Sequence, residues 1–136
     1  MKIHHIDDLV GKIYGVVESH RLSDGGYCRW LWDKNGSRQL GINEYGCADA
    51  MNILYTINAF PTGKEREEAL KALQGLQNPE TGLFVEETHH PIHTTAHCVA
   101  AIELFDAVPT HHATALDKYF TKEGLKELID GLKWVE

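Results

Sequence analysis

The chain has 136 residues, which is the length of one domain and enough to bury a hydrophobic core. A formal net charge of −7 disfavours binding to the phosphate backbones of nucleic acids. The sequence has neither an apolar run long enough to span a membrane nor an N-terminal secretion signal, and its 3 cysteines are typical of reduced thiols. We therefore expect residues 1–136 to form a single cytoplasmic domain that does not bind nucleic acid.

The first predicted element is a helix over residues 4–19, where Ile6, Leu9 and Ile13 recur with the spacing of one apolar face. A β-hairpin is predicted next, near residues 29–40. Its signal is Asn35 followed by a glycine, because both central positions of a type I′ turn need a positive φ. We expect this hairpin to be a small insertion at the rim of a helical body.

Four more helices are predicted, over residues 43–58, 64–77, 93–106 and 121–134. The helices over 64–77 and 121–134 have one apolar face each. Those over 43–58 and 93–106 are apolar almost all round and rich in alanine, which predicts that they are enclosed on all sides. The order of the five main helices is therefore outer, inner, outer, inner, outer.

The sequence also contains an internal repeat. A helix ends near a polar residue, a short turn with a glycine follows, an aromatic residue stands two positions later, and an inner helix begins. The pattern is clearest from Gln77 to Phe84. The equivalences are His20 with Gln77, Gly25 with Gly82, Tyr27 with Phe84, Val16 with Leu73, Ala48 with Ala96, and Asp49 with His97.

Gln77, Gly82 and Phe84, followed by an alanine-rich helix, resemble the repeat of prenyltransferases and squalene/terpene cyclases. The resemblance implies an all-α fold, an α/α toroid, in which helical hairpins form inner and outer rings around a cavity that binds a carbohydrate or isoprenoid-like ligand. Residues 1–136 would form about half of such a toroid. Its apolar edges would be covered by the remaining half of a longer chain or by a homodimer partner.

The motifs that carry chemistry in this family match the chain only in part. The cyclases protonate their substrate from an AspXaaAspAsp motif, whereas this chain has only the pair Asp7 and Asp8. The segment beginning at His93 resembles the stretch that carries the zinc-binding histidine of protein prenyltransferases. Asn43, Glu44 and Tyr45, however, stand where the other zinc ligands would lie. The resemblance therefore assigns no reaction to the chain.

A metal site is predicted from the histidine cluster, to which His89 and His90 also belong. His93 and His97 are four residues apart, so on a helix both rings share one face and can bind one ion. Asp49, which the repeat aligns with His97, would supply a carboxylate. Imidazole nitrogen with one carboxylate suits zinc or ferrous iron, and zinc is the ion we expect.

The predicted ligand-binding surface is the mouth where the glycine-containing turns lead into the inner helices. The free N–H groups of helix starts suit a polyhydroxyl or anionic ligand. Three hypotheses stay open: half of a ligand-binding cavity, a non-catalytic scaffold in which Gln77 bonds the start of the next inner helix, or a histidine-based metal-binding protein. The surface comprises Asn43, Glu44, Tyr45, Asp49, His90, His93 and His97.

Overall fold

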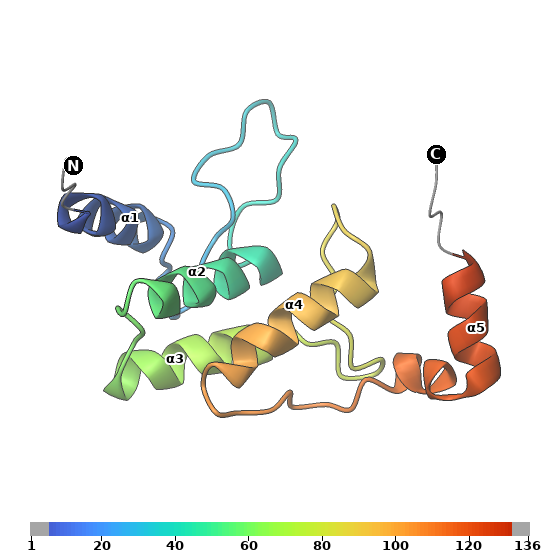
Figure 1. The fold of residues 1–136 in the computed structure, drawn as a ribbon. Helices are drawn as coiled ribbons and strands as arrows, with labels where there is room; N and C mark the ends of the chain where they lie inside the picture. Colours follow the sequence, from blue (N-terminus) through green and yellow to red (C-terminus); the bar gives the residue numbers. More distant parts are fainter. Residues whose placement is uncertain (1–5, 132–136) are drawn as a thin grey trace, which may run out of the picture.

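The computed structural model describes residues 6–131, and within them the regular elements are five α-helices and one 3-10 helix (Figure 1). The all-α class is confirmed. The parts of the first and last predicted helices at residues 4–5 and 132–134 lie outside the described residues. None of the described helices is long and apolar enough to cross a membrane. The elements are α1 (Asp7–Ser19), α2 (Glu44–Thr56), α3 (Gly63–Gln74), α4 (Pro91–Glu103), η1 (Thr114–Phe120) and α5 (Lys122–Gly131).

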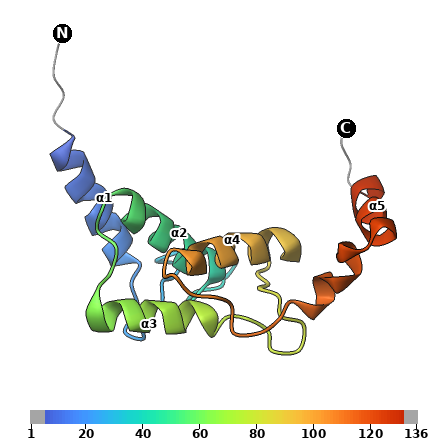
Figure 2. The same ribbon diagram turned by 60° about the horizontal axis from the view of Figure 1, so that its bottom comes forward.

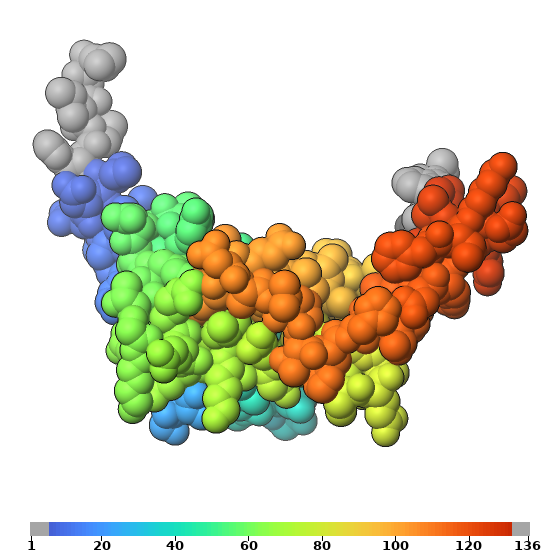
Figure 3. Space-filling view, turned by 90° about the horizontal axis from the view of Figure 1, so that it is seen from below, coloured from blue at the N-terminus to red at the C-terminus, as the bar shows by residue number. Residues whose placement is uncertain are grey.

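The helices form two layers. α2 and α4 lie side by side, and α3 packs beneath both (Figure 2). α1 packs against α2, and α5 packs against η1, so that these two helices stand at opposite ends of the molecule. The space-filling view shows the surface hollowed between them (Figure 3). α2 and α4 thus lie on the same side as this hollow, and α3 lies on the opposite side.

A glycine with a left-handed backbone and a buried aromatic residue precede each inner helix. Gly25 has a φ of 85° and Gly82 a φ of 69°. A Cβ atom at Gly82 would lie 2.0 Å from the carbonyl oxygen of His112, so this position needs a glycine for space as well. Two residues later, Tyr27 is 3% exposed and Phe84 is 0% exposed. The prediction that both aromatic rings are buried is confirmed.

Each of these aromatic residues is tied to the helix that follows it by its backbone N–H. Tyr27 N donates to Cys47 Sγ at 3.2 Å, and Phe84 N donates to Thr95 Oγ1 at 3.0 Å. Cys47 and Thr95 occupy equivalent positions of the repeat, one residue before the aligned alanines. The same contact is therefore made twice, with a thiol in one copy and a hydroxyl in the other.

The aligned ends of α2 and α4 are alike too. Asn58 and Asp106 follow these helices, and both have a left-handed backbone, with φ values of 58° and 52°. Asn and Asp tolerate this conformation better than most residues that carry a Cβ atom. The repeat thus extends from the turn before each inner helix to the residue that ends it.

The side chain of Gln77 joins two loops. Its Nε2 donates to the carbonyl oxygens of Gly82 at 2.8 Å and His111 at 2.7 Å, and its Oε1 accepts from the N–H of His111 at 2.8 Å. Our hypothesis that Gln77 bonds the start of α4 is wrong. Gln77 instead holds the segment that leads to η1 against the turn after α3.

Residues 29–40 do not form the predicted β-hairpin. Asn35 and Gly36 both have positive φ, 80° and 66°, as the predicted turn requires. The residues on either side nevertheless form no β-ladder in the described structure. The carboxylate of Asp33 instead accepts two backbone N–H groups just after the turn, at 2.7 and 3.1 Å. This local side-chain contact takes the place of cross-strand pairing, and the segment is a loop.

The inner helices are not enclosed on all sides by the described part of the chain. Ala48 and Ile102 are fully buried where α2 and α4 meet the core, but Ile53 of α2 and Ala96 of α4 are exposed. These exposed positions belong to helix faces that α3 does not cover. Composition does not show which face of a helix a neighbouring element covers, so it overestimated the burial of these two helices.

The outer helices are less alike than the repeat suggests. Leu73 of α3 is fully buried, whereas its equivalent in α1, Val16, is 61% exposed. Among the described helices, α3 packs against both inner helices, while α1 packs only against α2. α1 therefore leaves much of its apolar face uncovered by the described residues.

Phe84→Ala should lower the free energy of unfolding by about 3–5 kcal/mol, because it removes a fully buried ring from the core. Urea unfolding followed by circular dichroism measures the change. Val85→Ala is the matched control, since the neighbouring side chain is 52% exposed, and it should change stability by less than about 1 kcal/mol. Equal effects of the two substitutions would contradict a structural role for the aromatic of the repeat.

Gln77→Ala should cost about 1–3 kcal/mol for each buried backbone group left without a partner. Hydrogen exchange should show faster exchange at the amide of His111, whose N–H donates to the Gln77 side chain. Gln74→Ala is the control, because Gln74 makes a single exposed bond to the carbonyl of Val108. Unchanged exchange at His111 would show that the Gln77 side chain does not hold this loop.

Candidate functional site

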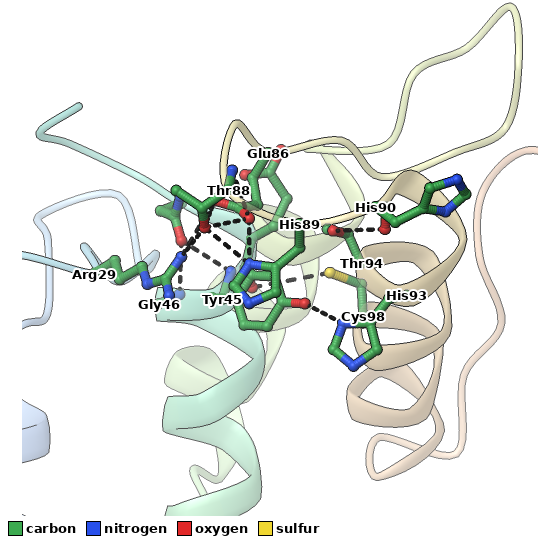
Figure 4. Close-up of polar contacts among 12 residues, drawn as sticks. Arg29, Tyr45, Gly46, Glu86, Thr88, His89, His90, His93, Thr94 and Cys98 are labelled. Carbon is green, nitrogen blue, oxygen red and sulfur yellow. Dashed lines mark hydrogen bonds and ion pairs between the residues drawn. The ribbon is translucent and has the colours of Figure 1, made fainter. Parts of the chain in front are cut away.

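α2 and α4 bring equivalent positions of the repeat next to each other at their N-terminal halves. The phenol oxygen of Tyr45 lies 2.5 Å from Nδ1 of His93, 48 residues later (Figure 4). One turn further along the helices, Asp49 Oδ1 lies 2.8 Å from Nε2 of His97, again 48 residues later. Asp49 and His97, which were expected to face one cavity, are thus in direct contact with each other.

Two predicted site residues hold the starts of the helices. Asn43 is buried, and its side chain accepts the backbone N–H groups of Tyr45 at 2.9 Å and Gly46 at 3.1 Å. At the start of α4, Nδ1 of His90 accepts the N–H of Ile92 at 3.3 Å. The buried Asn43 therefore has a structural role, and His90 combines capping with partial access to solvent.

The Tyr45 ring lies among three imidazole rings. The distance between ring centroids is 4.2 Å to His89, 4.9 Å to His97 and 6.1 Å to His93. The planes are inclined to that of Tyr45 by 25°, 25° and 19°, so the rings lie nearly parallel. We call these four residues the ring stack. Sequence analysis placed three of them in the site and His89 in the histidine cluster.

A buried carboxylate anchors one side of the ring stack. Glu86 Oε1 accepts from Nδ1 of His89 at 2.5 Å and from the backbone N–H of Thr88 at 3.0 Å, while Oε2 lies 3.2 Å from a guanidinium nitrogen of Arg29. Burial alone would raise the pKa of Glu86. The hydrogen bonds from Thr88 and His89 and the charge of Arg29 outweigh it, so this pKa lies below its ordinary value.

Sequence analysis missed Glu86, Thr88 and Arg29. A signal for one contact was present, because aligning Tyr27 with Phe84 also aligns Arg29 with Glu86, 57 residues apart. Their opposite charges fit the contact that the structure shows. Thr88, whose hydroxyl accepts from Arg29 at 2.8 Å, has no such signal.

The guanidinium of Arg29 also contacts two aromatic rings. Besides its polar bonds, it lies over the ring of Trp30, with 4.7 Å between the guanidinium carbon and the centroid, and over the ring of Tyr45 at 5.0 Å. Glu44, the remaining predicted site residue, is half-buried, and burial is the main reason that its pKa is raised.

The predicted metal triad is not assembled. His93 is bonded to Tyr45 and His97 to Asp49, so the two imidazoles engage different partners. Within residues 6–131, no three His, Cys, Asp or Glu side chains are grouped in a way that could hold a metal ion. The cysteines are free and buried, and burial raises the pKa of Cys47 to about 11, which disfavours the thiolate that metals bind.

A groove of about 610 Å³ runs between α4 on one side and η1 with α5 on the other. His93 belongs to both the groove and the ring stack. Among the described residues the lining includes no Lys or Arg, so these residues offer an acidic ligand no lysine or arginine cation. Its residues are His90, Ile92, His93 and Ala96 on the α4 side, and Tyr119, Glu127, Leu128 and Gly131 on the other.

No protein-family model matches the chain, and neither a curated protein nor a solved structure matches it. The functional inference therefore rests on the chemistry of the ring stack and the groove.

Glu86→Gln should flatten the dependence of stability on pH. Because the folded-state pKa of Glu86 is lowered, its carboxylate stabilises the fold above the ordinary pKa, and that contribution is lost as the pH falls through the folded-state value. The free energy of unfolding of the wild type should therefore fall more steeply than that of the variant between about pH 5 and pH 3. Glu87→Gln, at the exposed neighbouring carboxylate, should keep the wild-type slope. Parallel curves for wild type and Glu86→Gln would contradict the role assigned to this carboxylate.

Proposed function

We propose that the chain is a partial α/α-toroid module, similar to prenyltransferase and squalene/terpene cyclase repeats, whose concave side binds a carbohydrate. The ligand lies in the groove between α4 and α5. The observation that carries this proposal is that His93, one ring of the ordered ring stack, lines an open groove opposite the ring of Tyr119. The placement of α2 and α4 over α3 supports the toroid-like arrangement.

The chemistry of the groove suits a neutral saccharide. A sugar ring has apolar C–H faces and a rim of hydroxyl groups, so its site needs apolar surface next to hydrogen-bonding groups. Ile92, Ala96 and Leu128 supply the apolar surface of the groove. The hydrogen-bonding groups are those of His93, Tyr119 and Glu127.

Two other ligand classes fit less well. An acidic saccharide would meet Glu127 and no cation in the lining, on a chain whose net charge is −7. An isoprenoid-like ligand would use the apolar surface but would cover His93 and Glu127 without offering them hydrogen bonds, which costs free energy.

The partners predicted from the sequence remain part of the proposal. Leu9 of α1 is 57% exposed, and Leu125 of α5 is 47% exposed, so both ends of the molecule present apolar side chains. The remaining half of a longer chain, or a second copy, would cover such surfaces. A scaffold without a ligand explains the packing roles of Gln77 and Phe84, but it does not explain the ring stack at an open groove.

Binding is tested with neutral trisaccharides, cellotriose, maltotriose and chitotriose, titrated into the ¹⁵N-labelled chain and followed by NMR. At least one should bind saturably and shift signals along α4 and α5. His93→Ala and Tyr119→Ala should each weaken binding by about tenfold, because each removes a hydrogen-bonding ring from the groove.

The control is Tyr55→Ala, which removes an exposed tyrosine at the far end of α2 and should leave binding unchanged. Trigalacturonate and farnesol are titrated in parallel as the acidic and the apolar alternatives. Binding of farnesol without any trisaccharide, or trisaccharide binding that His93→Ala does not weaken, would contradict the proposed function.

A further inference from the structure

We infer that His93 and Tyr45 form a proton relay that donates a proton to an acetal oxygen, such as a glycosidic oxygen, held in the groove. The inference rests on the proposed function in one respect, the occupancy of the groove by a saccharide. His93 is the residue that touches the ligand. Tyr45 is a positioning residue that gives its phenol proton to Nδ1 of His93 and later takes it back.

The two ring nitrogens of His93 have different surroundings. Nδ1 lies 2.5 Å from the phenol oxygen of Tyr45. Nε2 has no hydrogen-bond partner among the described residues, and the exposed ring of His93 lines the groove. Nε2 is therefore the nitrogen left for a ligand.

The contact with Tyr45 also selects where the proton of His93 resides. A neutral imidazole has one N–H and one lone pair. Tyr45 is a buried residue, and His93 is the only partner of its hydroxyl within residues 6–131, so the phenol O–H donates to Nδ1. The proton of the imidazole is then on Nε2, which makes His93 a donor toward the groove.

His93 differs from the other imidazoles of the ring stack in its partner. His89 is bonded to the carboxylate of Glu86, and His97 to that of Asp49. A carboxylate only accepts from an imidazole, whereas a phenol can also give up its proton. Of the three imidazoles, His93 is thus the one whose partner, the phenol of Tyr45, can donate a proton to it.

The proposed step is balanced as follows. The Nε2–H bond of His93 breaks and an O–H bond forms on the acetal oxygen, while the phenol proton of Tyr45 moves to Nδ1 and leaves a phenolate. The C–O bond then breaks, with its electron pair going to the protonated leaving oxygen. Water adds to the carbon and releases one proton to Nε2 of His93, while the Nδ1 proton returns to the phenolate and restores the phenol. The guanidinium of Arg29, 5.0 Å from the centroid of the Tyr45 ring, lies over the ring that carries the transient negative charge.

The tautomer is tested by ¹⁵N NMR of the imidazole nitrogens in the uniformly labelled chain. The wild type should show His93 with Nε2 protonated and Nδ1 as acceptor, and Tyr45→Phe should convert it to a mixture of tautomers. Tyr55→Phe is the control and should leave His93 as in the wild type. A mixture of tautomers, or a protonated Nδ1, in the wild type would overturn the relay.

The activity is tested with 2-(4-nitrophenoxy)tetrahydropyran, a coloured acetal probe that needs only a proton donor and water. The rate due to the protein should fall about a hundredfold in His93→Ala and about tenfold in Tyr45→Phe. It should be unchanged in His112→Ala, which removes an exposed histidine that pairs with Asp117. Circular dichroism confirms that each variant is folded. A wild-type rate equal to that of folded His93→Ala would overturn the inference.

Failure of the relay and failure of the proposed function give different results. Trisaccharide binding with a mixed tautomer at His93 overturns the relay and leaves the binding function standing. Cleavage of the acetal that depends on His93 and Tyr45, without binding of any trisaccharide, supports the relay and shows that the assigned ligand class is wrong.

Discussion

The hydrogen bond from the N–H of a buried aromatic residue to a side chain of the following helix sets the register of this fold. Tyr27 makes this bond to Cys47, and Phe84 makes it to Thr95. A slip of the helix by one residue would remove the acceptor and leave a buried N–H unpaired, at a cost of about 1–3 kcal/mol. Because both copies of the repeat make this bond, equivalent positions of α2 and α4 lie at the same height along the two helices.

This alignment of α2 and α4 brings equivalent positions of the repeat into contact, and the site is built from such contacts. Arg29 meets Glu86. Tyr45 meets His93, and Asp49 meets His97, in the same way. Identical residues at these positions would place like charges or like donors together, which is unfavourable. At these contacts the two copies carry complementary groups, so the site is formed by positions at which the copies differ.

The sequence predicted those parts of the structure that depend on one segment or on the repeat. The all-α class and the buried Tyr27 and Phe84 follow from local patterns, and the pairing of Asp49 with His97 follows from the alignment of the inner helices. The prediction of a β-hairpin failed although Asn35 has the expected positive φ. The side chain of Asp33 accepts N–H groups that strand pairing would use. Turn signals predict the turn, not the partners of the residues beside it.

The predicted metal site failed for the same reason: the sequence predicts the positions of the side chains within one helix, but not their partners on the next helix. Spacing of four residues correctly places His93 and His97 on one face of α4, but a metal ion needs one unbonded nitrogen of each ring to point at the same position. The neighbouring helix α2 prevents this, because Tyr45 hydrogen-bonds one ring and Asp49 hydrogen-bonds the other. Asp49 was expected to act as a third ligand, whereas its position directly opposite His97 makes it a hydrogen-bond partner of that ring alone. Once each ring has its own partner, the nitrogen of His93 that α2 leaves unbonded becomes the chemically distinct atom of the site.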